Sequence, residues 1–360
     1  MTHYERVLTT LNHQSPGVIV SYEGFMDINA QKKLLPDLAE ATPQERMLRY
    51  LDTLDLSIVK VRWAWEPTHV IEEGDNYCIE ENEIGTRIRL QRTPWFREYI
   101  AHPVESEEDL AHLKLPDPEE PHRYKQAEQD IAFFSQRGYF VQGTMGGFFA
   151  GLWYNLRPLT LFLCDLAANP SFARKLIGAW GEFTLSVAKG LLERGVHAIH
   201  ISEDMGMTDR PWFSPATYER FFFPWHCRLA DLCHSYGAYM HMHSHGHIMP
   251  LMDQIVKTGV DILNPVGPGD HMDLELLKNK YGDRLVFNGG ISKYIGTMNH
   301  REIDRHIKQA IQVGSQGGGF IVCSESGIPS TFSQDDFRFY LSTLRKYREE
   351  YGGRGKAAGI

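Results

Sequence analysis

Eight short apolar runs, each followed by a segment with helical character, constrain the fold of this chain more than any other feature of its sequence. The runs begin near residues 18, 57, 139, 197, 238, 261, 284 and 319. Short strands that alternate with helices of about 10–20 residues predict an α/β fold with a parallel sheet. Eight such units in 360 residues favour a closed (β/α)8 TIM barrel. The chain lacks a Gly-x-Gly-x-x-Gly strand-to-helix turn, which argues against a dinucleotide-binding sheet.

The segment 66–100 departs from this alternation. It contains Glu72-Glu-Gly-Asp-Asn, which is typical of a turn, and Thr86-Arg-Ile-Arg-Leu, in which polar and apolar residues alternate. These patterns predict hairpins, so we expect a small β insertion near one rim of the barrel. The expected organisation is a single barrel domain over residues 1–351 that contains the insertion, followed by a disordered tail at 352–360.

The composition restricts the classes of function. The formal net charge is −9 and no basic block stands out, which argues against a nucleic-acid partner. The five cysteines are too few and too scattered for a disulfide framework. The N-terminus lacks the pattern of a signal peptide, and no run approaches the ~18 apolar residues of a membrane span. We therefore expect a cytoplasmic protein without a membrane contact.

Histidines stand at every second position directly after one of the apolar runs, at His241, His243, His245 and His247. Because side chains in a strand alternate between its faces, His241 and His243 are expected to share a face. His245 follows where the strand runs into a glycine turn. Imidazoles that converge at a strand end commonly hold a divalent transition metal, so His243 and His245 are candidate metal ligands. The alternative is a set of unrelated histidines, some in the core and some solvated.

Polar residues at the other strand ends supply further candidates, because barrels of this type carry their sites at the carboxyl ends of the strands. Glu203 and Asp204 follow the fourth strand and, with His241, are candidate acid–base groups. Glu203 and Cys323 are also candidate additional metal ligands. The alternatives are a solvated loop pair for Glu203-Asp204 and a small core residue for Cys323. The candidate substrate-binding residues are Glu23, Arg62, Gln142, Met145, Asn264 and Asn288.

Several longer motifs follow one another along the chain. They include Tyr4-Glu-Arg-Val-Leu, Phe213-Ser-Pro-Ala-Thr-Tyr, His243-Ser-His-Gly-His-Ile, Gly259-Val-Asp-Ile-Leu-Asn-Pro-Val and Phe287-Asn-Gly-Gly-Ile. In this order they resemble the uroporphyrinogen decarboxylase superfamily, over essentially the whole chain. The resemblance implies a (β/α)8 barrel and membership of a group that includes the decarboxylases of haem synthesis and zinc-dependent, corrinoid-linked methyltransferases.

The decarboxylase branch is distinguished by an arginine-rich Arg-x-Ala-Gly-Arg-like segment and by a Phe-Ser-Asp-Ile-like segment with an essential aspartate. Here the first strand continues Tyr22-Glu-Gly-Phe-Met-Asp-Ile-Asn without arginine, and the second ends Arg62-Trp-Ala-Trp without aspartate. A porphyrinogen with eight carboxylates needs cationic clamps. We therefore do not expect porphyrinogen decarboxylation.

The methyltransferase branch carries His-x-Cys-Gly after the fifth strand and a Gly-Cys-Gly-Ile-like turn after the eighth. This chain has His243-Ser-His-Gly and Glu325-Ser-Gly-Ile, so histidine and serine replace the two cysteines, and Cys323 lies three residues before the second position. The resemblance implies a metal ligand at His243 and a ligand of changed chemistry at His245.

The leading hypothesis is a metal-dependent methyltransferase, with zinc as the expected metal, in a corrinoid-linked methyl-transfer or demethylation system. Its partners are expected to be a corrinoid protein and a small methyl donor or acceptor. One alternative is a uroporphyrinogen decarboxylase-like lyase acting on a smaller carboxylated substrate. Another is a non-catalytic barrel that binds a tetrapyrrole or corrinoid. An amidohydrolase-type metal site is a weaker alternative, because that family carries its His-x-His on the first strand.

Overall fold

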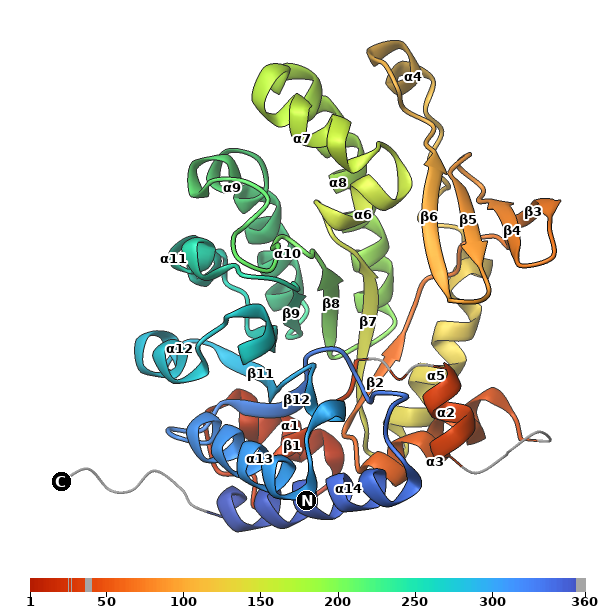
Figure 1. The fold of residues 1–360 in the computed structure, drawn as a ribbon. Coiled ribbons are helices and arrows are strands. Elements are labelled where there is room, and N and C mark those ends of the chain that lie inside the picture. The colour runs from red at the N-terminus through yellow and green to blue at the C-terminus, as the bar shows by residue number, and fades with distance from the viewer. Residues whose placement is uncertain (25, 27, 36–40, 354–360) are drawn as a thin grey trace.

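Eight parallel strands form the body of the protein (Figure 1). The computed structural model describes residues 1–24, 26, 28–35 and 41–353. The strands follow the sheet order β1-β12-β11-β10-β9-β8-β7-β2. Their bounds are β1 Val20–Ser21, β2 Ile58–Val61, β7 Phe140–Gly146, β8 Ala198–Ser202, β9 Tyr239–His243, β10 Ile262–Val266, β11 Val286–Ile291 and β12 Phe320–Ser324. Each coincides with one of the eight apolar runs, and the predicted TIM barrel is confirmed.

The two outer strands of this sheet, β1 and β2, close the barrel. The Ser57 N–H donates to the Ser21 carbonyl at 3.3 Å, and the Ser21 hydroxyl donates to the Asp55 carbonyl at 2.5 Å. These two bonds join the end of β1 to the residues just before β2. The carboxyl ends of the strands therefore form one rim.

Helices surround the barrel (Figure 1). Thr and Ser side chains start several of them with capping boxes, for example Thr2 with Glu5 and Ser333 with Asp336. Their bounds are α1 His3–Leu11, α2 Ile28–Leu34, α3 Pro43–Leu54, α4 Glu107–His112, α5 Lys125–Ser135, α6 Ala150–Asn155, α7 Leu159–Ala168, α8 Pro170–Glu193, α9 Pro215–Phe221, α10 Phe223–Ser235, α11 Met252–Ile255, α12 Leu274–Tyr281, α13 His300–Gly314 and α14 Gln334–Gly352. Within the described residues, none of these helices is long and apolar enough to cross a membrane.

The predicted β insertion is confirmed as an antiparallel sheet. It consists of β3 His69–Glu73, β4 Tyr77–Glu81, β5 Arg87–Gln91 and β6 Phe96–Ala101, in that order. The Thr86 hydroxyl donates to the Asn155 carbonyl at 2.5 Å, and Arg123 makes a bidentate ion pair with Glu83 at 2.8 and 2.9 Å. These contacts hold the sheet to one side of the barrel, beside α6 and β7 (Figure 1).

Helix α1 closes the end of the barrel where the strands begin. Its buried Val7 and Leu11 belong to a cluster inside the barrel that includes Phe140, Ala198 and Ile321. The much larger core lies between the strands and the outer helices. Burial of apolar side chains on both faces of the strands is typical of parallel sheets and explains why the sequence runs are continuously apolar. A ligand must therefore reach the barrel from the opposite rim.

Helix α14 is tied to the first strand by a buried arginine. The Arg348 side chain, which is 1% exposed, donates to the Ile19 carbonyl at 2.6 Å and to the Asp55 carboxylate at 2.8 Å. The predicted tail begins at residue 352, but α14 includes Gly352, and residues 354–360 lie outside the described residues. The division into one domain and a tail stays a prediction.

Replacing Arg348 with leucine is expected to lower the free energy of unfolding by about 3 kcal/mol, because the Ile19 carbonyl and the Asp55 carboxylate lose a charged donor. Urea titration measures this loss. Arg338→Leu on the same helix is the matched control, since its ion pair with Asp335 is exposed and should contribute less than about 1 kcal/mol. Equal losses in the two variants would contradict the proposed role of Arg348.

Candidate active site

The register of three neighbouring strands brings polar side chains together at the rim. Ser202 at the end of β8 pairs with His243 at the end of β9, which pairs with Asn264 on β10. The loops that follow β9 and β10 add His245 and Asp270, whose side chains lie 3.0 Å apart. These side chains form a polar group, called here the His243 cluster, at the ends of three successive strands.

His243 is held in one orientation by its neighbour on β10. Its Nδ1 lies 2.6 Å from Asn264 Oδ1, while the Asn264 amide nitrogen donates to the Asn288 carbonyl at 3.3 Å. Because the amide oxygen faces His243, Nδ1 is the nitrogen that carries the proton. Burial lowers the pKa of His243 to about 4. The ring is therefore neutral at pH 7, with a lone pair on Nε2.

Asp204 faces this lone pair. Its Oδ1 lies 3.5 Å from His243 Nε2 and also accepts from the His245 N–H at 3.2 Å, while Oδ2 accepts from the Tyr154 hydroxyl at 3.3 Å. Asp204 has a φ of 42°, in the left-handed region that non-glycine residues rarely adopt and that is enriched at functional sites. Two acceptors that face each other at this distance favour a cation or a proton between them.

His245 and Lys293, both partly exposed, form a second polar group with the buried Asp270. Its Nδ1 lies 3.0 Å from Asp270 Oδ2, and Lys293 Nζ lies 2.8 Å from Asp270 Oδ1. Burial lowers the pKa of His245, but the hydrogen bond to Asp270 and the charge of Asp204 outweigh burial, so the pKa is raised overall. Burial raises the pKa of Asp270, but the bonds from His245 and Lys293 outweigh it and lower the pKa. Asp270 is therefore a carboxylate at neutral pH.

The two histidines have the donor chemistry of metal ligands. Each presents Nδ1 to an oxygen acceptor, Asn264 or Asp270, which is how ligating imidazoles are commonly oriented so that Nε2 remains for the metal. The 3.5 Å between His243 Nε2 and Asp204 Oδ1 is close to the ~3.4 Å edge of a tetrahedron with zinc bonds of ~2.1 Å. This pair fits two ligand positions. Across residues 1–24, 26, 28–35 and 41–353, however, no three His, Cys, Asp or Glu side chains are grouped closely enough to hold a metal.

Glu203, a candidate acid–base group and metal ligand, lies apart from this cluster. Its side chain is fully buried, and its two oxygens accept from the N–H groups of Phe148 and Phe149 at 2.7 and 2.8 Å. His226 Nε2 lies 2.8 Å from Glu203 Oε1. These contacts occupy both carboxylate oxygens and fix the loop between β7 and α6. The structure gives Glu203 a positioning role in that loop.

His241 and three candidate substrate-binding residues form a hydrogen-bond network inside the barrel. His241 Nδ1 lies 2.9 Å from Gln142 Oε1, and its Nε2 lies 3.4 Å from Asn288 Nδ2. Asn264 joins Asn288 to His243. All four are at most 2% exposed, and burial keeps the pKa of His241 well below its usual range. The network therefore contacts His243 through Asn264, and its side chains are buried rather than exposed in a cleft.

Glu23 and Cys323 lie side by side near the ends of β1 and β12. Glu23 accepts from the Ser324 hydroxyl at 2.6 Å, and burial raises its pKa to about 7. Burial and the nearby Glu23 raise the pKa of Cys323 well above the usual thiol range, so Cys323 is a thiol at neutral pH. Its sulfur lies 3.8 Å from the Asn264 amide nitrogen. The oxygen of the same amide faces Nδ1 of His243, so Asn264 contacts both side chains.

The remaining candidates, Arg62 and Met145, line a cleft beside the rim. The cleft has a volume of about 440 Å³ and is walled by Trp63, Trp65 and Trp180, among other side chains. A second cleft of about 750 Å³ adjoins it and is lined by Asp204 and Tyr154, with Arg97 and Ser202 shared between the two. The clefts therefore connect the aromatic wall to the His243 cluster.

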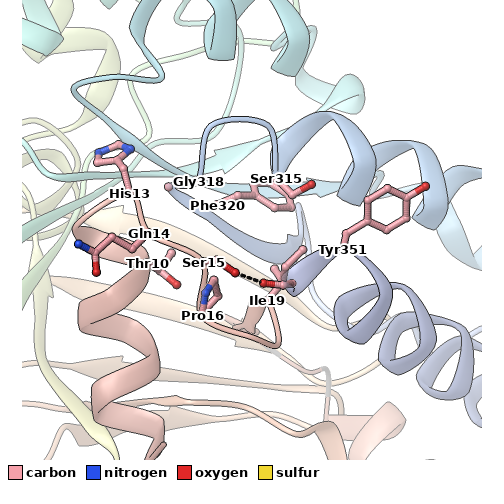
Figure 2. Close-up of a pocket in the computed structure, with 12 residues that line it drawn as sticks. Thr10, His13, Gln14, Ser15, Pro16, Ile19, Ser315, Gly318, Phe320 and Tyr351 are labelled. Carbon is pink, nitrogen blue, oxygen red and sulfur yellow. Dashed lines mark hydrogen bonds between the residues drawn. The ribbon is translucent and has the colours of Figure 1, made fainter. Parts of the chain in front are cut away.

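Another pocket lies at the opposite end of the barrel, where the strands begin (Figure 2). Thr10, His13, Ser315 and Phe320 line it, together with the end of α14. Its volume of about 30 Å³ corresponds to roughly one water molecule. It is too small for a substrate, so the rim remains the candidate site.

Sequence reasoning missed Asp270, Lys293 and Arg97. Asp270 lies in the loop after β10, and the rule that strand ends carry the site could have found it. Lys293 follows β11 in the same way. Arg97 lies on β6 of the insertion, and nothing in the sequence indicates that β6 reaches the rim.

Comparisons with known proteins agree with this architecture. The family model for uroporphyrinogen decarboxylase (URO-D) matches residues 79–347. The structure is similar to a methyltransferase from Methanosarcina mazei, with a TM-score of 0.69 and 14% sequence identity over 96% of this chain and 99% of that chain. A B12-independent methionine synthase from Shewanella sp. has a TM-score of 0.48 and 13% identity over 85% of this chain and 86% of that one. These structural similarities concern the fold. Sequence comparison with curated proteins gives no significant match.

Replacing Glu203 with alanine is expected to destabilise the fold by about 3–5 kcal/mol, because two buried N–H groups and His226 lose their acceptor. Asp204→Asn is the matched control and should change stability by less than about 1 kcal/mol, since asparagine tolerates positive φ. Denaturant titration compares the two variants. A stable Glu203→Ala protein would contradict the positioning role.

Glu23 is expected to make stability depend on pH. Burial raises the pKa of Glu23 to about 7 in the folded state. The contribution of the protonated carboxyl to the free energy of unfolding is therefore fully present below pH ~4.5 and is lost as the pH rises through about 7. The wild type should therefore lose about 3 kcal/mol relative to Glu23→Gln between pH 4.5 and pH 8. Unfolding of both proteins across this range measures the difference. Parallel pH profiles would show that folding does not raise the pKa of Glu23.

Proposed function

This chain belongs to the uroporphyrinogen decarboxylase family, and from that premise we propose that it is a metal-dependent methyltransferase. One observation carries the proposal. His243 Nε2 and Asp204 Oδ1 face each other at 3.5 Å, and neither atom carries a proton, because the imidazole proton is on Nδ1. A divalent cation satisfies both acceptors at once.

The proposed ligands are His243, Asp204 and His245. A rotation of the His245 side chain is needed, because the described residues do not group three such donors as they now lie. Asn264 and Asp270 orient the two imidazoles, and Lys293 holds Asp270 in place. Zinc held by these residues would supply Lewis acidity toward an oxygen or thiol of the small substrate.

The donor set differs from the His-x-Cys-Gly motif of the corrinoid-linked branch. Imidazole and carboxylate ligands give up less electron density than two thiolates, so the site should be a stronger Lewis acid, suited to an ether oxygen or a pterin. Cys323 is left out of this proposed set, because its buried thiol donates to the Ser324 carbonyl at 3.0 Å and contacts the Asn264 amide nitrogen. We further propose that the methyl group is exchanged with a corrinoid protein that docks over the rim.

A decarboxylase reaction on uroporphyrinogen has weaker support. Eight carboxylates require several cationic partners, whereas the clefts at the rim are lined by two arginines, Arg62 and Arg97. Lys293 is engaged with Asp270. The charge arrangement is therefore suited to a substrate with few carboxylates.

Protein purified without a histidine tag is expected to bind about one zinc ion per chain. His243→Ala should lose this metal and keep its fold, because the ring contributes one of the proposed bonds. His247→Ala is the matched control, since His247 Nδ1 faces the His271 carbonyl outside the cluster. Elemental analysis measures the metal, and unchanged zinc in His243→Ala would remove this residue as a ligand.

The purified protein is expected to demethylate methylcob(III)alamin in the presence of a thiol or tetrahydropterin acceptor. Absorbance of the cobalt centre follows the reaction. Chelation should abolish it and added zinc should restore it, because the proposed chemistry needs the Lewis acid. Uroporphyrinogen is the control substrate, and efficient release of carbon dioxide from it would overturn the proposal.

A further inference from the structure

The aromatic cleft beside the rim has features of a specific binding site that the proposed chemistry does not use. It lies between the end of β2, the end of β7 and helix α8, with β6 of the insertion on its open side. We propose that it binds a planar aromatic ring that carries two substituents, a carboxylate and a hydroxyl or ether oxygen. The proposal rests on the proposed function, for which this ring compound is the small substrate.

Two arginines supply the carboxylate site. Arg62 follows β2 and Arg97 lies on β6, and both line the cleft with exposed side chains. In the part of the chain that the structure describes, neither forms an ion pair with a carboxylate, although the formal net charge of the protein is −9. Guanidinium groups bind carboxylates through paired N–H donors. One carboxylate placed between them satisfies both.

Trp65 offers the ligand ring an exposed indole on the wall of the cleft, beside the buried Trp63 and Trp180. Trp65 is 37% exposed and lies nearly parallel to Trp180, with an interplanar angle of 10° and centroids 6.4 Å apart. Trp63 meets Trp65 edge to face at 5.1 Å. Exposed indole faces favour offset stacking with another planar ring. A saturated ring of the same size makes poorer contact with such a wall.

Two residues that line the cleft carry buried polar atoms without a hydrogen-bond partner in the described part of the chain. Trp63 Nε1 and Thr184 Oγ1 are buried and have no hydrogen-bond partner among the described residues. Their residues are 4% and 2% exposed. A buried donor without a partner is unfavourable, and such groups commonly have a partner from outside the chain. The indole nitrogen can only donate, so a ligand that reaches it must offer an acceptor.

The cleft leads directly to the His243 cluster. Ser202 lines both this cleft and its neighbour, which contains Asp204, and Ser202 pairs with His243 in the sheet. A ring bound beside Trp65 therefore lies in the cleft that adjoins the one lined by Asp204. Arg97 belongs to the insertion, so the antiparallel sheet takes part in recognising the substrate.

Titration with simple ring compounds tests the inference without turnover. 4-Hydroxybenzoate should bind and change the intrinsic tryptophan fluorescence. Phenol, which lacks the carboxylate, and cyclohexanecarboxylate, which is not planar, should each bind at least about tenfold more weakly. Equal affinities for the three compounds, or no saturable binding of any, would overturn the proposal.

Arginine variants identify the site. Arg62→Ala and Arg97→Ala should each weaken 4-hydroxybenzoate binding about tenfold or more and leave phenol binding unchanged. Arg89→Ala is the matched control, since Arg89 lies on β5, pairs with Glu98 and does not line the cleft. The substituted side chains are exposed, and circular dichroism checks that each variant folds. Unchanged affinity in both Arg62→Ala and Arg97→Ala would contradict the carboxylate site.

Binding and methyl transfer are measured separately, so the two proposals can fail separately. Ring binding with the expected selectivity in a protein that lacks methyl transfer supports the cleft and removes the proposed function. Methyl transfer in a protein that does not bind the ring acids supports the function and removes the cleft as their site.

Discussion

Parallel pairing of eight strands is the constraint on which the rest of this molecule depends. Because every strand runs in the same direction, the residue that follows each strand emerges at one rim. In-register pairing then decides which of these residues become neighbours, as with Ser202, His243 and Asn264. At the other end, α1 fills the interior with Val7 and Leu11. Polar chemistry and ligand access therefore meet at the same place.

Two carboxylates that are adjacent in the sequence have opposite roles in this arrangement. Glu203 turns into the protein and binds the N–H groups of Phe148 and Phe149. The next residue, Asp204, adopts a positive φ and turns toward His243. The bonds that fix Glu203 therefore hold the backbone directly before Asp204.

The sequence predicted the parts that depend on local pattern. Periodicity predicted the eight strands and the hairpins of the insertion, and the structure contains both the parallel strands and the antiparallel sheet. Periodicity also predicted a shared face for His241 and His243, and both rings contact His200. No periodic pattern in the sequence indicates which loops lie next to one another. Asp270 orients His245 only because the turn after β10 folds back over β9, and Arg97 reaches the rim only because the inserted sheet packs against α6.

The attachment of that sheet has an evolutionary consequence. It is joined to the barrel at a few points, including the Arg123–Glu83 ion pair and the Thr86 bond to Asn155. Its strands can therefore exchange surface residues without disturbing the parallel ladder or the groups around His243. A lineage built on this plan can acquire new preferences through mutations in one appended sheet while inheriting the reaction chemistry intact.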